Sequence, residues 1–253
     1  TTVKENNSNY KILGFSAEEF SNFPEIKIRA KTKLNQKLFK EAIQQVIFAT
    51  SRDENRTFLN GALFKIKDNK IEIITTDSHR LSLKNIEPIE IKSLLAEGVE
   101  VIIPYRALSE LSRLLLDNKE VFTEIRIGEK QILFILFPDG QKNSIRIYSR
   151  LIEGQFPDYH QIVPNSFKTE IKVNTEEFKG KMERISLFVR EDLNTVKIEA
   201  ANKKDSQKEE RCEIILNAEN PSTGEASEKI SCLKKGEDIT ITFNTNYILD
   251  VLK

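Results

Sequence analysis

The chain has 253 residues, which is enough for more than one domain at ~100–200 residues each. It carries 39 lysines and arginines and 39 aspartates and glutamates, so its net charge of zero excludes a nucleic-acid binder that is basic over its whole surface. No apolar run approaches the ~18 residues of a membrane span and residues 1–9 show no signal-peptide pattern, so we expect a cytoplasmic protein without a membrane segment.

The first predicted elements are an isolated strand and an amphipathic helix. Residues 1–24 look like the tail of a preceding domain, because the strand expected at 9–15 has no partner of its own. Asn35 can cap a helix whose apolar residues recur on one face. These residues are Leu38, Phe39, Ala42, Ile43, Val46 and Ile47.

Turn-linked antiparallel strands surround a second helix. The pair Asp68-Asn69 is a tight-turn signal between two of the strands, and the helix follows Pro104. The strands are expected at residues 57–67, 70–75, 81–83, 121–127, 131–137 and 142–150. The apolar stripe of the helix consists of Leu108, Leu111, Leu114 and Leu115.

A weak internal repeat predicts two copies of one helix-plus-sheet domain. Leu34 and Asn35 open one unit, Val173 and Asn174 open the other, and each pair precedes a helix that leads into a strand. The boundary between the two units is expected near the proline-bounded segment 156–165.

The second unit contains two further helices and one polar insertion. Glu177 is placed to complete a capping box with Asn174, and Asn244 can cap a helix over residues 245–253. Residues 217–228 are polar and rich in helix and strand breakers, which predicts a mobile loop. No strand follows residue 253, so this second copy looks incomplete.

Two kinds of chemical site receive little support. Asp77, Ser78 and His79 are adjacent, but neighbours in an extended segment point to opposite faces and cannot form a nucleophile–base relay. His79, His160, Cys212 and Cys232 lack short metal-ligand spacing, so we expect no metal and no cofactor. The two cysteines are either free, which fits a reducing compartment, or joined by one disulfide.

Basic residues recur on the two helices of the first unit. Lys37 and Lys40 lie on the first helix, and Arg106 and Arg113 lie on the second, so adjacent helices would make one basic patch. Most charged helix faces are simply solvated, and that is one interpretation of this patch. The more specific interpretation is a surface that faces the phosphates of a nucleic acid. Arg52 and Arg56 would extend that patch, and nothing beside it would read bases.

The helix after Asn174 has an apolar residue on the wrong face. Leu187 lies nearly opposite the stripe that includes Met182 and Ile185, and Phe188 lies at its shoulder. A lone exposed leucine is common, but the pair is better interpreted as part of a subunit interface.

Five segments, in order and at similar spacing, resemble successive motifs of the bacterial sliding clamp, the beta subunit of DNA polymerase III. They are Arg56-Thr57-Phe58-Leu59-Asn60-Gly61, Thr76-Asp77-Ser78-His79-Arg80-Leu81, Ile102-Ile103-Pro104, Phe156-Pro157-Asp158-Tyr159, and Phe243-Asn244 with Tyr247. The resemblance covers nearly the whole chain, and the ordered set is more specific than any single motif.

The resemblance implies an α+β fold of repeated DNA-clamp domains, each with two helices packed on antiparallel sheets. Residues 1–27 would end the first clamp domain, 28–167 would form the second, and 168–253 would form an incomplete third. The chain would then be a fragment that lacks most of the first domain and the C-terminal end of the third.

The implied function is that of a non-catalytic processivity factor of the replicative DNA polymerase. As a homodimeric ring, the intact protein would encircle double-stranded DNA independently of sequence. It would tether polymerase subunits, the clamp loader and repair proteins that carry Gln-Leu-x-Leu-Phe-like peptides. Two alternatives remain, a non-clamp interaction scaffold built from the same repeats and, with less support, an enzyme that uses His79.

The resemblance also implies a peptide-binding pocket between the second and third domains. Its matched positions are Arg56, Leu59, Thr76, Ser78, His79, Arg80, Leu81, Pro157, Gln161, Ile162, Asn244 and Tyr247. Leu59, Leu81, Pro157 and Ile162 would form an apolar cleft, and the polar members would meet the peptide backbone. Two positions depart from the family pattern, since Ser78 replaces a usual glycine and Gln161 a common arginine. Leu187 and Phe188 fall at the family's dimer contact.

Overall fold

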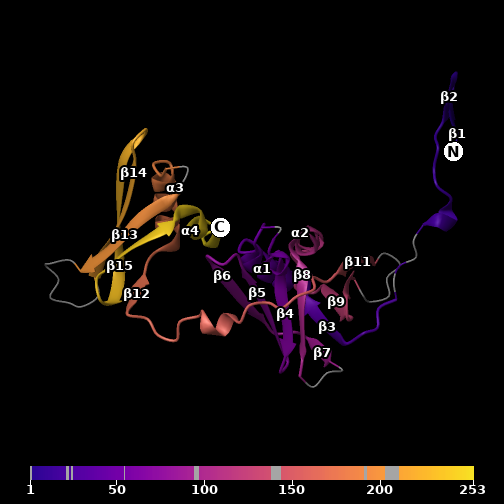
Figure 1. Ribbon diagram of the computed structural model, residues 1–253, viewed down its shortest axis with the longest axis horizontal. Coiled ribbons are helices and arrows are strands. Elements are labelled where there is room, and N and C mark those ends of the chain that lie inside the picture. The colour runs from indigo at the N-terminus through magenta and orange to yellow at the C-terminus, as the bar shows by residue number, and fades with distance from the viewer. Residues whose placement is uncertain are drawn as a thin grey trace.

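The protein, seen in a computed structural model, forms two bodies and an N-terminal hairpin in a row (Figure 1). The structure describes residues 2–20, 23, 25–53, 55–93, 97–137, 144–190, 193–202 and 211–253. Within these ranges, no helix has the length and apolar character that crossing a membrane requires.

The N-terminal segment is a small exposed hairpin. Strand β1 (Thr2–Glu5) pairs antiparallel with β2 (Ser8–Lys11), and a short 3-10 turn, η1 (Ala17–Glu19), follows. The prediction of a partnerless strand at 9–15 was therefore wrong. Asn6 adopts a positive φ of 46°, which asparagine tolerates better than most residues, and the chain reverses there.

The central body contains two antiparallel sheets and two helices. Its sheets have the strand orders β6-β5-β4-β8 and β11-β10-β9-β3-β7. In chain order its elements are β3 (Ala30–Asn35), α1 (Gln36–Ile47), η2 (Thr57–Leu59), β4 (Gly61–Lys67), β5 (Lys70–Thr76), β6 (Leu81–Ile86), β7 (Glu90–Ser93), β8 (Val99–Pro104), α2 (Tyr105–Leu114), β9 (Phe122–Ile127), β10 (Gln131–Leu136) and β11 (Ile145–Arg150). Side chains from both helices and both sheets share one core.

Local sequence explains where α1 begins and which face it buries. The Asn35 side chain accepts a hydrogen bond from the Leu38 amide (3.1 Å), as expected for its N-cap. Phe39 and Ile43 are fully buried, whereas Leu38 is 46% exposed and does not belong to the core face predicted for it. In α2, Leu108 and Leu111 are buried but Leu114 is also exposed. The strand predicted at 57–67 begins as a 3-10 turn, since η2 precedes β4.

A connecting segment, residues 151–168, joins the two bodies. Ile152 forms a β-bridge with Ile102 of β8, and Tyr159, in the short 3-10 turn η3 (Tyr159–Gln161), is buried against the same sheet. Residues 161–168 are all exposed. The segment is therefore anchored to the central body up to Tyr159 and lies on the surface beyond it.

The third body is a five-stranded antiparallel sheet with two helices. Its strand order is β12-β15-β14-β13-β16. Its elements are β12 (Thr169–Lys172), α3 (Thr175–Ser186), β13 (Thr195–Asn202), β14 (Arg211–Asn220), β15 (Gly224–Gly236), β16 (Ile239–Asn244) and α4 (Thr245–Val251). Asn174 and Asn244 cap α3 and α4 as predicted, each through its side-chain oxygen. In place of a reciprocal capping-box contact, Glu177 binds Lys181 Nζ (2.8 Å).

Residues 217–228 form a β-hairpin, and the predicted mobile loop was wrong. Ala218 pairs with Ala226 and Asn220 pairs with Gly224, so the turn is confined to residues 221–223. Gly224 has φ of 103°, a conformation that glycine adopts without steric cost. The strand-breaking residues therefore close a tight turn while the polar residues around them extend the ladder.

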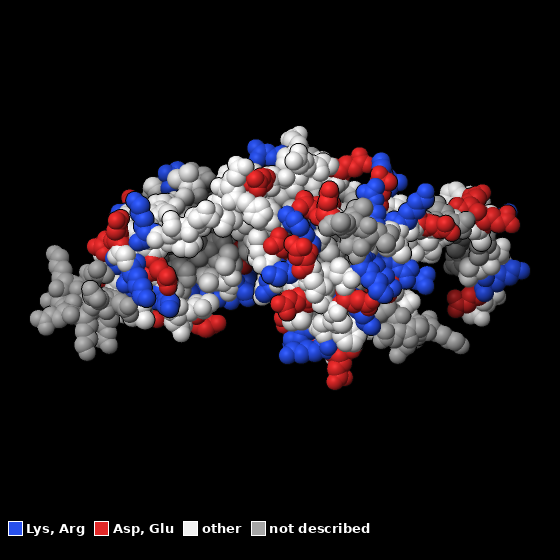
Figure 2. All heavy atoms as spheres, turned by 90° about the horizontal axis from the view of Figure 1, so that it is seen from below, with Lys and Arg blue, Asp and Glu red and all other residues white. Residues whose placement is uncertain are grey.

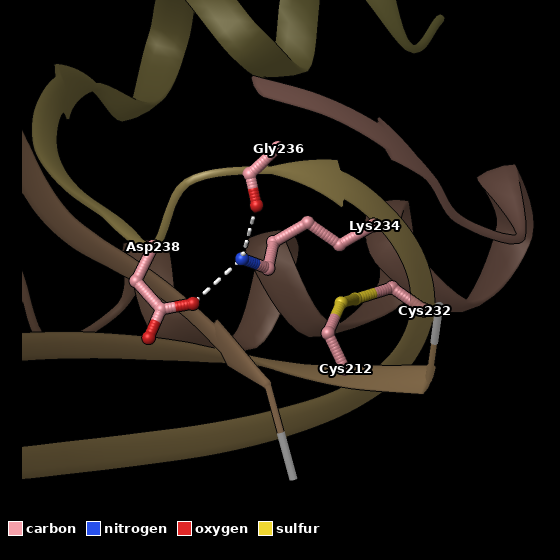
Figure 3. The surroundings of a disulfide bond; sticks show 5 residues. All are labelled: Cys212, Cys232, Lys234, Gly236 and Asp238. Atoms are coloured by element: carbon pink, nitrogen blue, oxygen red, sulfur yellow. Dashed lines mark hydrogen bonds and ion pairs between the residues drawn. A yellow bond between two sulfur atoms is a disulfide. The ribbon is translucent and has the colours of Figure 1, made fainter. Parts of the chain in front are cut away.

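The two cysteines are joined, which settles the alternative that the sequence left open. Cys212 of β14 and Cys232 of β15 are opposite partners in the register and form a disulfide (Figure 3). Nearby, the side chain of Lys234 is fully buried, and its ammonium binds Asp238 Oδ1 (2.6 Å) and the Gly236 carbonyl oxygen (3.1 Å). The carboxylate and the carbonyl satisfy a charge that would otherwise be costly to bury.

Candidate functional site

The turn between β5 and β6 is held by its own side chains. Asp77 Oδ1 accepts hydrogen bonds from the amides of His79 (2.9 Å) and Arg80 (3.0 Å). The Thr76 hydroxyl donates to the Arg80 carbonyl oxygen (2.7 Å) and accepts from the Ser78 amide (3.1 Å). Ser78 adopts φ of 77°, so a serine occupies a left-handed conformation that usually favours glycine.

Arg80 is the residue at which the two bodies meet. Its Nε donates to Asp77 Oδ2 (3.0 Å), one terminal nitrogen donates to Asp250 Oδ2 (2.7 Å), and the other donates to the Phe48 carbonyl oxygen (2.8 Å). Its guanidinium also lies over the ring of Tyr247, 4.5 Å from the centroid. Asp250 and Tyr247 belong to α4, so one arginine joins a turn of the central body to a helix of the third.

Helix α4 presents two side chains that contact the central body on one face. Tyr247 and Asp250 are three residues apart, a spacing that places both on the same side of a helix. The Tyr247 ring stacks on His79, with centroids 6.2 Å apart. Burial alone would raise the pKa of Asp250, but hydrogen bonds from Lys253 and Arg80 outweigh it and hold that pKa below its usual range.

The other predicted pocket residues of the central body lie at different depths. Arg56 Nη1 donates to the Ser78 hydroxyl (2.9 Å), so the two residues brace each other at the surface. Leu81 is half-buried against a small cluster that includes Tyr159. Leu59 is only 2% exposed, so it lies beneath the surface and offers no open wall to a ligand.

The predicted residues of the connecting segment are more exposed. Gln161 Nε2 donates to Asp158 Oδ2 (2.9 Å), and Ile162 is 62% exposed. Pro157 is half-buried and lines an open hollow of about 870 Å³ between this segment and strands β4 and β8. Among the predicted pocket residues, Pro157 alone belongs to the described lining of that hollow, whose main part therefore lies away from Arg80.

Tyr159 forms part of the wall of the same hollow. Its hydroxyl donates to Glu72 Oε2 (3.0 Å), and burial together with that carboxylate raises the pKa of Tyr159 to about 12. The phenol is therefore neutral at any physiological pH and acts as an anchor for the connecting segment.

Sequence reasoning missed three partners of Arg80. Asp77 and Phe48 belong to the central body, and Asp250 lies 170 residues away along the chain. The spacing of Asp250 from Tyr247 was the available signal, because a residue three positions along a helix shares its face. Among the described residues, no group of three or more His, Cys, Asp or Glu side chains is placed to hold a metal ion.

Four of the five proposed basic residues lie on adjacent helices among acidic neighbours, and Arg52 follows α1. Helices α1 and α2 are in contact, as the side-by-side arrangement required. Lys37 binds Asp117 (2.8 Å), which raises the pKa of the lysine, and Arg113 binds Glu110 (3.2 Å). Lys40 is half-buried, whereas Arg52 and Arg106 are exposed. On the face drawn in Figure 2, basic and acidic side chains are intermixed rather than separated.

Leu187 and Phe188 occupy the C-terminal end of α3. Leu187 is the C-cap residue and is 73% exposed, whereas Phe188 is half-buried and packs against the core of the third body. Leu187 is therefore the more available of the two for contact with another chain.

Comparisons with known proteins identify the family. Residues 33–158 match the family model described as DNA polymerase III beta subunit, central domain, and residues 160–253 match the model of its C-terminal domain. The chain belongs to the DNA polymerase III beta subunit family. Its two described bodies have the α+β fold of sliding-clamp structures, with helices packed on antiparallel sheets.

Members of this family are similar to the chain along nearly its whole length. The beta sliding clamp of Bacillus subtilis (strain 168) is 32% identical over 254 residues, which takes in 100% of this chain and 63% of that protein. The beta sliding clamp of Streptococcus pneumoniae serotype 4 is 33% identical over 249 residues, 97% of this chain and 61% of that protein. A crystal structure of the DNA polymerase sliding clamp from Bacillus subtilis matches with a TM-score of 0.82 at 32% identity, covering 99% of this chain and 62% of that chain. The chain thus spans somewhat less than two thirds of the length of these relatives.

Proposed function

We propose that this chain is part of a DNA sliding clamp, a non-catalytic subunit that confers processivity on the replicative polymerase. In the proposed arrangement, residues 1–27 end a first clamp domain, 28–167 form the second and 168–253 belong to the third. The observation that carries the proposal is the contact between a turn of the central body and α4, where Arg80, Tyr247 and Asp250 meet. Membership of the beta-subunit family supports it.

The proposed binding site for partner peptides lies along this contact. His79 and Tyr247 offer stacked rings with polar edges, and the exposed Ile162 and half-buried Leu81 and Pro157 offer apolar surface. Apolar anchors flanked by a few fixed polar groups suit a short peptide with leucine and phenylalanine side chains. The proposed partners are polymerase subunits, the clamp loader and repair proteins that carry Gln-Leu-x-Leu-Phe-like peptides.

The proposed contact with DNA is electrostatic and independent of sequence. Lys37, Lys40, Arg52, Arg106 and Arg113 would face phosphates from the inner side of a closed ring. Because a ring holds duplex DNA topologically, the affinity of each contact can be low and the total charge can be zero. The ring itself would be a homodimer, with Leu187 and Phe188 in the contact between subunits.

A peptide-binding measurement tests this proposal. Fluorescence anisotropy of a labelled Gln-Leu-x-Leu-Phe peptide with the full chain is expected to show saturable binding. His79→Ala and Pro157→Ala should each weaken binding by about tenfold, because each removes a side chain at the proposed contact surface. Glu90→Gln, which removes an exposed ion pair with Lys92 on β7, is the matched control.

The opposite result would favour a different function. A folded chain that binds no such peptide, or binds it equally well in all variants, would favour the interaction-scaffold alternative over the clamp.

A further inference from the structure

The guanidinium of Arg80 already has an acceptor on each of its three nitrogens. Asp77 and Phe48 bind it from the central body, and Asp250 binds it from α4. The side chain is 19% exposed. Such a group is poorly placed to exchange partners for an incoming peptide, because each bond that it gives up leaves a carboxylate or a backbone carbonyl oxygen without its donor.

Asp250 is held as firmly as the arginine that it binds. Its Oδ2 accepts from Arg80 (2.7 Å) and its Oδ1 accepts from Lys253 Nζ (2.6 Å), so both oxygens are engaged. The Asp250 side chain is 21% exposed. Charge-assisted bonds of this length fix the orientation of both side chains more strongly than neutral hydrogen bonds do.

The position of Tyr247 depends on the same pair. Its ring is fixed on one side by the Arg80 guanidinium and stacks on His79. Asp250 lies one helical turn after Tyr247 and holds the Arg80 guanidinium against the helix that carries the ring. The geometry of the peptide site thus depends on the carboxylate of Asp250, which acts through its hydrogen bond with Arg80.

We propose that Asp250 is a positioning residue of the peptide site, which docks α4 on the turn at 77–81 by binding Arg80. The inference rests on the proposed function, and it assigns Arg80 the same positioning role rather than direct contact with the peptide. The competent site then exists only while α4 is docked, so the apparent affinity falls in proportion to the docked fraction. Relative preferences among peptides stay unchanged, because the contacting side chains are the same.

The experiment is a double-mutant cycle on peptide affinity in the full chain. Asp250→Asn keeps the shape and removes the charge, and Arg80→Met removes the guanidinium. Each is expected to weaken binding of the labelled peptide by about tenfold, the usual scale for loss of one charge-assisted bond. The double variant should bind about as weakly as Arg80→Met, since both changes break one link. Glu90→Gln is the control.

Two further readouts separate positioning from general stability. In Asp250→Asn, hydrogen exchange should rise in α4 and in the turn at 77–81 but not in α3. The ratio of affinities for the Gln-Leu-x-Leu-Phe peptide and for the same peptide with alanine in place of glutamine should match that of the wild type. Additive losses in the double variant, a changed ratio, or faster exchange throughout the third body would each overturn the inference. A wild-type chain that binds no peptide would instead overturn the proposed function.

Discussion

Ser78 shows how one backbone angle shapes the candidate site. Its φ of 77° is disfavoured for a residue with a Cβ atom, and the conformation is held by the Thr76 and Asp77 side chains. The hydroxyl partly compensates, because it accepts a hydrogen bond from Arg56. The turn therefore keeps a glycine-like geometry while adding a polar link that a glycine lacks.

Replacing Ser78 should separate strain from hydrogen bonding. Ser78→Gly and Ser78→Ala both lose the hydroxyl, but only alanine keeps the strained Cβ atom. We expect the glycine variant to be more stable than the alanine variant by about 1 kcal/mol in urea unfolding. Equal stabilities would show that the turn carries no strain at this position.

Tyr159 gives the molecule a measurable alkaline transition. Its pKa of about 12 lies above the ordinary value of 10, so folding favours the neutral phenol. The resulting stability is complete below pH 10 and is lost as the pH rises through about 12, an effect of about 3 kcal/mol. Absorbance of tyrosinate should show one late-titrating tyrosine, which Tyr159→Phe removes and Tyr10→Phe, at an exposed site, leaves in place.

The residues that sequence reasoning located correctly are those whose interactions are local. The side chains of Asn35 and Asn174 each accept a hydrogen bond from the amide three positions ahead, so a short stretch of sequence is enough to predict each cap. Leu38 was placed in the core by helical spacing alone, but nothing in the described part of the chain covers that edge of α1, where Leu38 is 46% exposed. Asp250 was missed because its partner is distant in sequence, and a lone carboxylate on a helix usually indicates only solvation.

At the scale of elements, the four helices and strands β4, β5, β6, β9, β10 and β11 were predicted, but no bounds were predicted for β3, β7, β8 or the strands of the third body, and the insertion was mistaken for a loop. Alternating apolar residues identified β5 and β9, and a continuous apolar run identified β10, each to within one residue. In residues 217–228 only the small Ala218 and Ala226 face the core and residues 221–225 are exposed, so the apolar alternation is weak and the composition resembled that of a loop. The pairing of β14 with β15 depends on backbone bonds and on the register that the buried residues before it impose.

The β14–β15 disulfide should stabilise the third body measurably. Cys212 and Cys232 are separated by 20 residues, and closing a loop of that size in the unfolded chain corresponds to about 3 kcal/mol. Thermal unfolding with and without a reductant should show a lower midpoint for the reduced protein. A Cys212→Ala/Cys232→Ala variant should be insensitive to the reductant, and an unchanged midpoint in the native chain would contradict the expectation.

At the scale of the whole molecule, the net charge is zero, but individual basic side chains differ in whether a carboxylate neutralises them. Lys37 and Arg113 have carboxylate partners, whereas Arg106 is exposed on α2 and has no ion pair among those found in the described part of the chain. Of the proposed phosphate-facing residues, Arg106 and Arg52, which is also exposed and without an ion pair in the described part of the chain, therefore offer their charges with the least competition. The domain assignment relied on the ordered motifs, because a weak repeat by itself does not identify the family.

Arg106→Ala should weaken binding to a short DNA duplex about equally for all sequences. Loss of one phosphate contact should reduce the slope of log affinity against log salt by about 1. Equilibrium binding at several salt concentrations measures this slope, with Lys92→Ala on β7 as control. An unchanged slope would remove Arg106 from the proposed DNA-facing surface.

The anchored connecting segment has a consequence for how the two bodies separate. Tyr159 holds the segment to the central body, so only the exposed residues 160–168 link it to β12, a reach of at most about 32 Å. Arg80 and Asp250 therefore remain at a high effective concentration, on the order of millimolar, even after they part. Reclosure is a unimolecular event that dilution does not prevent. A competing ligand or a change of charge shifts the joint toward its open form by making its contacts less favourable.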